Sequence, residues 1–212
     1  MSLLHSTGQE TFDVPFAPGE SPFRVKGIAY KGHIAYTERY VPGGMAAMKA
    51  AMDPAAAAFF EQPLLAASMY DVFPLAQAGV ACAQLTRLSF PQFLRIRSRV
   101  QAESDINGVY KFLMNLVTAE AIGQRIPKII GQYFDFVETE ITEVQPKRVV
   151  TVAHGLPEAV APWFALVATT YFDTALKLAG SSTPRSAPEL TGAMGTSHGV
   201  NTVSIRTVVT WT

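Results

Sequence analysis

The chain has four histidines that could take part in chemistry: His5, His33, His154 and His198. A zinc site encoded within one helix needs paired histidines, as in HxxxH or HExxH, and no two histidines here have such a spacing. We therefore predict no metal site. A lone imidazole beside a strand is usually solvated or hydrogen-bonded to the backbone, and we expect that structural role for His33 and His154.

Cys82 is the single cysteine, so no disulfide can form within the chain, which is typical of a reducing compartment. It lies in a run of small residues, Ala78–Ala83, on a predicted helix. Free cysteines are usually small buried side chains. The alternative is a thiol that faces a pocket and is open to acylation or oxidation, although the nearest cation along the chain, Arg87, is not adjacent to it.

Three alternating arginines, Arg95, Arg97 and Arg99, form a short basic cluster. Arg95 and Arg99 share one helix face at a spacing of i, i+4, and Glu103 extends that face by one more step. A phosphate or carboxylate headgroup fits such a pair, so we predict an anion contact at Arg95 and Arg99. A solvated helix face with one intrahelical ion pair is the alternative interpretation.

The sequence contains no motif of a known catalytic centre. A serine hydrolase would need a GxSxG nucleophile elbow, and a nucleotide enzyme would need a phosphate loop or a dinucleotide fingerprint; the chain has none of these. Glu138 and Glu140 share one face of a predicted strand, where solvated carboxylates are a simpler interpretation than acid–base catalysis. We therefore favour a protein that is not an enzyme, assign no catalytic residue and identify no cofactor.

The composition indicates one domain without a surface for polyanions. The chain has 212 residues, 49% of them hydrophobic, and its 17 basic and 17 acidic residues give a net charge of zero. This balance argues against nucleic-acid binding and a polybasic membrane anchor, and near-neutral proteins associate readily, so we predict a homodimer. No signal-peptide pattern is present and no apolar run approaches the roughly 20 residues of a membrane span, so we expect a cytoplasmic protein.

The first part of the chain is predicted to form a tail, a hairpin and a block of helices. Residues 1–22 are rich in Gly and Pro and predict a flexible N-terminal tail before a single domain, 23–212. Phe23–Tyr30 and His33–Val41 are β-rich on either side of Lys31-Gly32, which predicts a hairpin. Helices are predicted over Met45–Met52, Ala55–Phe60 after an Asp53-Pro54 cap, Leu75–Leu88, Phe90–Val100, Asp105–Leu116 with Asp105 at its start, and Thr118–Tyr133.

The second part is predicted to be mostly sheet. A hairpin is predicted from Phe136–Val144 and Arg148–Ala153. A long helix is predicted over Pro157–Leu178, and Pro162 is early enough in it to mark its true start. Ser181–Gly199 is rich in Ser, Pro, Gly and Thr, which predicts a mobile loop, and Val200–Thr212 alternates as a half-buried strand does. The order predicts an α+β fold: an antiparallel sheet of about four to five strands with a block of helices packed on one face.

The helix after Pro162 is apolar around most of its girth, so several of its sides must be covered. Other helices, a partner subunit or a bound apolar ligand can provide that cover. We favour a non-enzymatic module that binds an apolar small molecule, or signals through it, in a pocket on the order of 300 Å³ near Cys82, Phe112 and Trp163. The alternatives are an oligomeric interaction protein without a ligand, and an enzyme or carrier acting on a tetrapyrrole or lipid.

Several short motifs resemble those of a myxobacterial paralogous family of unknown function and similar length. They are Lys26-Gly27 before a β-rich run, Met69–Pro74 before a helix, Gly108-Val109-Tyr110 at a helix start, Ile126-Pro127, and a closing strand that ends at Trp211. The resemblance covers Phe23 to Trp211. That family is similar to the superfamily of haem–nitric-oxide-binding domains, vinyl-4-reductase small-molecule domains and TRAPP vesicle-tethering subunits.

This resemblance implies an α+β fold with a helical half and a sheet, often dimeric and often enclosing an apolar pocket. The haem branch has a Tyr-x-Ser-x-Arg motif and a proximal histidine, whereas this chain has no tyrosine in Arg95–Arg99 and no histidine between His33 and His154. The departure argues against haem binding in that manner. The TRAPP branch can carry a fatty acyl chain on a buried cysteine, for which Cys82 is the only candidate.

Overall fold

The structure is a computed structural model that describes residue 12 and residues 15–107 and 119–212, and it confirms an α+β fold. The first half is mostly helical: β1 (Arg24–Lys26), α1 (Gly27–Tyr40), α2 (Gly44–Ala50), α3 (Pro54–Ala58), the 3₁₀ turn η1 (Phe59–Glu61), β2 (Met69–Asp71), α4 (Val72–Thr86) and α5 (Phe90–Asn107). The second half carries the main sheet: α7 (Ala119–Tyr133), β3 (Glu138–Gln145), β4 (Arg148–Pro157), η2 (Glu158–Val160), α8 (Ala161–Leu178), β5 (Arg185–Ser197) and β6 (Val200–Thr210).

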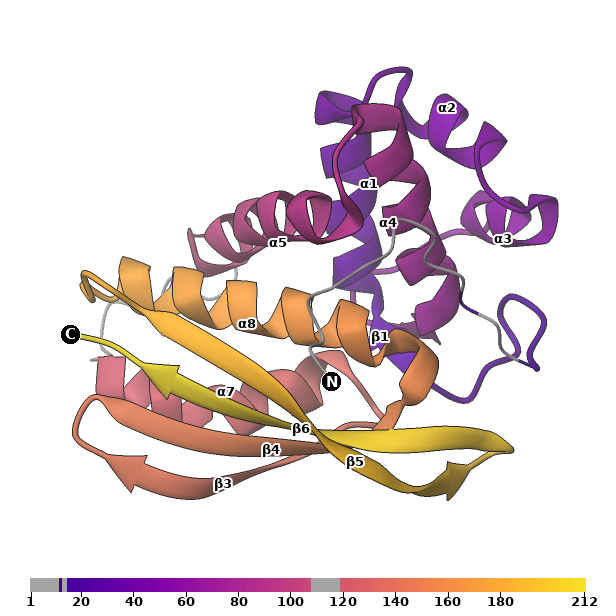
Figure 1. Cartoon of the computed structure of the whole chain (residues 1–212). Coiled ribbons are helices and arrows are strands. Elements are labelled where there is room, and N and C mark those ends of the chain that lie inside the picture. The colour runs from indigo at the N-terminus through magenta and orange to yellow at the C-terminus, as the bar shows by residue number, and fades with distance from the viewer. Residues whose placement is uncertain (1–11, 13–14, 108–118) are drawn as a thin grey trace.

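The main sheet has four antiparallel strands in the order β3-β4-β6-β5, in agreement with the predicted count. Helix α7 packs against β3 and β4, and α8 packs against β5 and β6, so the two helices cover one face of the sheet. Helix α5 packs on the other side of α8, which therefore lies between the sheet and the helical half (Figure 1). Strands β1 and β2 form a separate antiparallel pair within that half.

Local sequence signals explain where several helices begin. The Asp53 side chain accepts hydrogen bonds from the backbone N–H groups of Ala55 and Ala56, so the predicted cap of α3 is confirmed. Asp71 caps α4 in the same way, accepting from the N–H of Phe73 at 2.9 Å. Pro162 occupies the first turn of α8, as predicted, where its missing N–H costs nothing.

The predicted hairpin at the start of the domain is wrong. Only Arg24–Lys26 forms a strand, and the second run belongs to helix α1. The buried side chains of α1 include Tyr30, His33 and Thr37, which recur at the spacing of one helix face. Packing of this face against α4 and α5 outweighs the β-propensity of the tyrosines and isoleucines in the segment.

The predicted loop over 181–199 is also wrong, because most of it forms β5, which pairs with β6 along its length. Gly192 and Gly195 have φ values of 106° and 147°, and the register shifts near both residues. Glycine in such conformations is typical of β-bulges, and proline is tolerated on an edge strand such as this one. The Gly and Pro content that predicted a loop therefore belongs to a bulged edge strand.

Two further boundaries differ from the prediction. Helix α5 continues to Asn107, so Asp105 lies inside it and does not begin a new helix; the rest of the helix predicted over Asp105–Leu116 lies outside the described residues. Packing also begins before Phe23: the ring of Phe16 lies 6.1 Å from that of Phe23, and the N–H of Gly19 donates to Asp71 at 2.9 Å. Residues of the predicted tail thus pack against the domain.

One continuous core of buried side chains spans both halves. Phe23 lies where they meet, with its ring 6.4 Å from Phe73 of α4, 5.4 Å from Phe136 before β3 and 5.8 Å from the His198 imidazole. Edge-to-face geometry at these distances is favourable for aromatic pairs. Within the described ranges, no helix combines the length and apolar character needed to cross a membrane.

Candidate ligand cavity

A cavity of about 50 Å³ lies where the two halves of the molecule meet. Its lining comes from β1 and α1 on one side, α5 on another, and α7 and α8 from the second half. Most of the lining side chains are apolar, among them Val25, Ile130, Phe134, Trp163 and Phe172. Because it is built from both halves, the cavity depends on how α5 packs on α8.

Helical periodicity brings the lining side chains of α8 together. Trp163, Val167 and Tyr171 follow at successive steps of four residues and therefore lie along one face of the helix. The aromatic rings of this region also contact one another: Phe134 lies 6.1 Å from Trp163 and Tyr171 lies 6.0 Å from Tyr133. The predicted ligand-pocket residue Trp163 does line a cavity.

A polar chain crosses the apolar wall on α5. The guanidinium of Arg97 donates through Nη2 to the carbonyl of Ala29 at 2.7 Å and, more weakly, to Gln101 Oε1 at 3.4 Å. Gln101 Nε2 donates to Asp105 Oδ1 at 2.6 Å, and the hydroxyl of Tyr133 donates to Asp105 Oδ2 at 2.5 Å. Residues 97, 101 and 105 share one face of α5, so the chain runs along the helix and ends on α7.

Arg97 is 4% exposed, an unusual position for a charged side chain. Burial lowers the pKa of Arg97 to about 10, and Asp105 opposes that shift. The guanidinium is therefore charged at neutral pH, yet it forms no ion pair within the described part of the chain. Its Nε is buried and has no hydrogen-bond partner among the same residues.

Asp105 is not free to complete an ion pair with Arg97. Both of its carboxylate oxygens already accept hydrogen bonds from neutral groups, one from Gln101 and the other from Tyr133. Burial raises the pKa of Asp105, while these two hydrogen bonds and the charge of Arg97 oppose the shift. The charges of Arg97 and Asp105 therefore attract each other only across the intervening amide of Gln101.

Cys82 lies in a separate cluster between α1 and α4 and is not part of the cavity lining. Its Sγ is 3.5 Å from Thr37 Oγ1 and 3.7 Å from His33 Nε2, and it is fully buried. Burial raises the pKa of Cys82, and burial together with the nearby charge of Arg97 lowers the pKa of His33 well below its usual value. Both groups are therefore neutral, and the arrangement suits packing rather than thiolate chemistry.

The structure does not bring the predicted site residues together. Trp163 lines the cavity, Cys82 lies in the cluster beside His33, and Phe112 lies outside the described residues.

Arg95 and Arg99 are exposed on α5, and an anion contact there remains a prediction. The buried member of the basic cluster is Arg97, between them. Sequence reasoning missed it because it grouped the arginines by their exposed i, i+4 face; the polar series at 97, 101 and 105 was the available signal.

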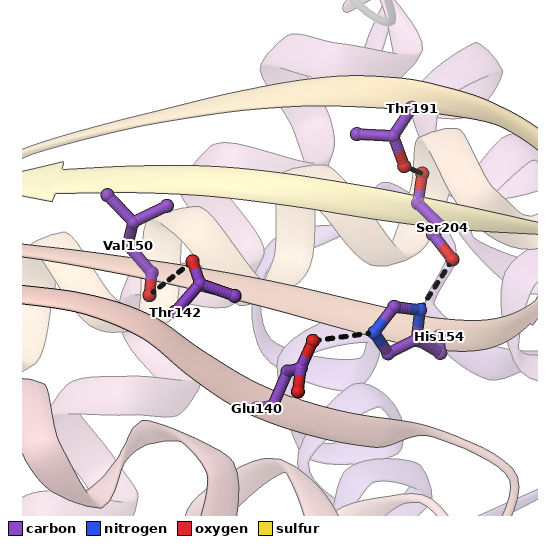
Figure 2. Close-up of polar contacts among 6 residues, drawn as sticks. All are labelled: Glu140, Thr142, Val150, His154, Thr191 and Ser204. Carbon is purple, nitrogen blue, oxygen red and sulfur yellow. Dashed lines mark hydrogen bonds and ion pairs between the residues drawn. The ribbon is translucent and has the colours of Figure 1, made fainter.

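A second polar arrangement lies on the main sheet (Figure 2). His154 on β4 is hydrogen-bonded through Nδ1 to Ser204 Oγ of β6 at 2.8 Å, and its Nε2 lies 3.3 Å from Glu140 Oε1 of β3. The order Ser–His–Glu is that of a hydrolase triad, but Ser204 is only 1% exposed and a substrate has no access to its hydroxyl. Thr191 of β5 donates to the Ser204 carbonyl at 3.1 Å, so these contacts tie neighbouring strands together.

Across residues 15–107 and 119–212, no three His, Cys, Asp or Glu side chains are grouped as a metal ion would require. The polar arrangements of the described chain include the Arg97 chain beside the cavity, the neutral cluster around Cys82 and the Ser204–His154–Glu140 contacts on the sheet.

Comparison with known proteins identifies similar folds but no similar sequences. An H-NOX protein from K. algicida in its Fe(II) unliganded form matches with a TM-score of 0.63 at 8% identity, over 88% of this chain and 96% of that chain. An H-NOX protein from S. oneidensis in the Fe(II)NO ligation state matches with a TM-score of 0.59 at 10% identity, over 88% of this chain and 99% of that one. No family model and no curated protein matches the sequence. The described chain therefore has an H-NOX-like fold.

Proposed function

We propose that the protein is a non-enzymatic module that binds a small apolar molecule in the cavity between α5, α7 and α8 and signals its presence. The observation that carries this proposal is an apolar cavity at the junction of the two halves, with a buried, incompletely bonded arginine in its wall. Ligand pockets commonly combine an apolar lining with a few polar groups that fix orientation. A site between two halves also suits signalling, because occupancy acts on both at once.

The ligand must be smaller than the sequence suggested. A cavity of about 50 Å³ is well below the roughly 300–1,000 Å³ of pockets for drug-sized ligands. At about 10–15 Å³ for each water-sized group, it has room for roughly four such groups. This cavity is therefore smaller than the expected pocket on the order of 300 Å³, and the proposal concerns a ligand of a few non-hydrogen atoms.

Haem does not fit this site. The similar structures include an oxygen-binding H-NOX domain and an H-NOX protein in the Fe(II)NO ligation state, so haem is the first ligand to test against this cavity. A porphyrin needs several times the volume of this cavity. The described lining contains no histidine, cysteine or methionine, and its side chains of an iron-binding type are those of Tyr133 and Tyr171, of which Tyr133 is hydrogen-bonded to Asp105. His33, on α1, is directed at Cys82 instead. We therefore derive no role for haem, and the same size argument disfavours a tetrapyrrole substrate.

Trp163 supplies a direct test, because it lines the cavity while the other tryptophan, Trp211, lies at the end of β6. The purified protein is examined by native mass spectrometry, and a library of small apolar compounds is then titrated against its tryptophan fluorescence. We expect retained mass or a saturable change in Trp163 emission, which a Trp163→Phe variant loses while Trp211→Phe keeps it. No retained mass and no saturable change with any compound would overturn the proposal.

A homodimer remains a prediction from the near-neutral charge. The same native spectra test it, since a dimer doubles the mass of the chain. A dimer whose spectra show no retained ligand, and whose tryptophan emission responds to no compound, would favour the alternative of a pure interaction module.

A further inference from the structure

The charge balance around the cavity is incomplete. Arg97 is a buried cation whose hydrogen bonds go to the neutral oxygens of Ala29 and Gln101. The nearby acid, Asp105, has both oxygens engaged by other donors. Buried charges in proteins are usually paired or bound to a ligand of opposite charge, because an unpaired ion loses its hydration without compensation.

The unpaired charge lies at the cavity, because Arg97 is one of its lining residues. The lining from α7 and α8 is mostly apolar, including Ile130 and Phe172, while Gln101, Tyr133 and Tyr171 also line the space. A ligand in this space therefore contacts hydrocarbon and aromatic carbon over most of its surface, and Arg97 is the cation in the described lining. A guanidinium matches a carboxylate in both charge and geometry, and it offers the N–H groups to donate.

We infer that the cavity selects very small monocarboxylates, with the carboxylate against Arg97 and a hydrocarbon body of one or two carbons against Phe134, Trp163 and Phe172. This inference rests on the proposed ligand-binding function and names the class of ligand. Arg97 forms no ion pair in the described part of the chain, so the carboxylate of the ligand supplies the opposite charge. The ligand completes the charge balance that Asp105, held by Gln101 and Tyr133, does not complete.

The two exposed arginines of the same helix provide matched controls. Arg95 and Arg99 lie on either side of Arg97 in sequence but are directed to solvent. Replacing either removes one positive charge from α5 without touching the cavity. An effect of long-range charge would appear in all three variants, whereas a direct contact with a carboxylate would appear only at Arg97.

The experiment compares acetate with acetamide, which has the same shape and no charge. Both are titrated against Trp163 fluorescence and by calorimetry in a buffer free of other carboxylates. We expect acetate to bind at least about tenfold more tightly than acetamide, as a charged hydrogen bond in a buried site would give. In Arg97→Met the preference disappears, while in Arg95→Met and Arg99→Met it stays.

The outcomes separate the two levels of the proposal. If neither compound binds, and no compound of the wider library does, the ligand-binding function itself fails. If neutral compounds bind as well as their acids, the cavity is a ligand site but the inference about carboxylates is overturned. The same holds if the preference survives in Arg97→Met.

Should Arg97→Met fail to fold, the comparison of acetate with acetamide on the wild-type protein decides the question alone. The variant Arg97→Lys adds a second measurement. It keeps the charge but loses the planar N–H geometry, so acetate binding should weaken while its advantage over acetamide is partly retained.

Discussion

Two small systems of polar groups lie inside this protein, one beside the cavity and one between α1 and α4. In one, Arg97, Gln101, Asp105 and Tyr133 form a chain beside the cavity; in the other, His33 and Cys82 are buried together as neutral groups. The sequence identified the arginine cluster and the cysteine as candidates, but not which arginine is buried. The choice between Arg95, Arg97 and Arg99 depends on which face of α5 packs against α1 and α8, a tertiary fact that the alternation of three arginines does not contain.

His33 makes the stability of the protein depend on pH. Its pKa in the folded state is well below the usual 6.5, because burial and Arg97 disfavour the charged imidazole. Below pH 6.5 the unfolded chain takes up a proton that the folded protein does not, so the stabilisation present at higher pH is lost as pH falls. We expect the free energy of unfolding to fall by up to about 1.4 kcal/mol per pH unit between pH 6.5 and 5.5 from this residue.

Urea denaturation of the wild type and of His33→Gln across pH 7.5 to 5.5 checks this slope. The variant should show a shallower dependence, whatever its absolute stability. The carboxyl groups with raised pKa, such as those of Asp71, Asp105 and Asp173, titrate in both proteins, so the difference in slope isolates His33. Equal slopes would show that the folded imidazole takes up its proton at the same pH as the unfolded chain, which would contradict the lowered pKa of His33.

At the scale of elements, amphipathic periodicity located most helices, and regular alternation located β6. The errors came where local composition and tertiary packing disagree. Helix α1 contains β-favouring residues but buries a helical face, and β5 contains loop-favouring residues but pairs with β6 through bulges at its glycines. In both segments the deciding contacts are with elements distant in sequence, so no local pattern reveals them.

The start of α1 depends on a close approach that only glycine permits. A Cβ added at Gly27 would lie 2.0 Å from the carbonyl oxygen of Leu65, a backbone atom that cannot rotate away. Gly27→Ala should therefore destabilise the protein by roughly 2 kcal/mol through overpacking. Gly131→Ala on α7 is the control, since a Cβ there meets nothing within 4 Å and alanine favours the helix by about 0.5–1 kcal/mol. Thermal unfolding of both variants provides the comparison. If Gly27→Ala were as stable as Gly131→Ala, the close contact between position 27 and Leu65 would be contradicted.

At the scale of the whole molecule, the two halves share one core, and α8 contacts both the sheet and α5. A bridge between Val25 of β1 and Phe134 after α7 links them further. The predicted single domain implies that neither half stays folded when the other unfolds. Two spectroscopic signals distinguish the halves, because both tryptophans belong to the second half while much of the helix belongs to the first.

We therefore expect one cooperative transition. Tryptophan emission and far-UV circular dichroism should show the same denaturation midpoint, in the wild type and in Phe134→Ala, which should lose about 3–5 kcal/mol. Phe134 packs on Phe164 and Trp163 at the junction, so its loss weakens both halves together. Separate midpoints in the two signals would instead indicate two domains that unfold independently.

The edges of the main sheet limit how copies of this chain can associate. Strand β3, at one edge, carries Glu138, Glu140 and Glu143, while β5, at the other, carries Pro188 and the two bulges at its glycines. Charge, proline and bulges at an edge all hinder the addition of another strand. The sheet is thereby closed to extension by a second copy, and a homodimer would have to associate through helices or the open face of the sheet.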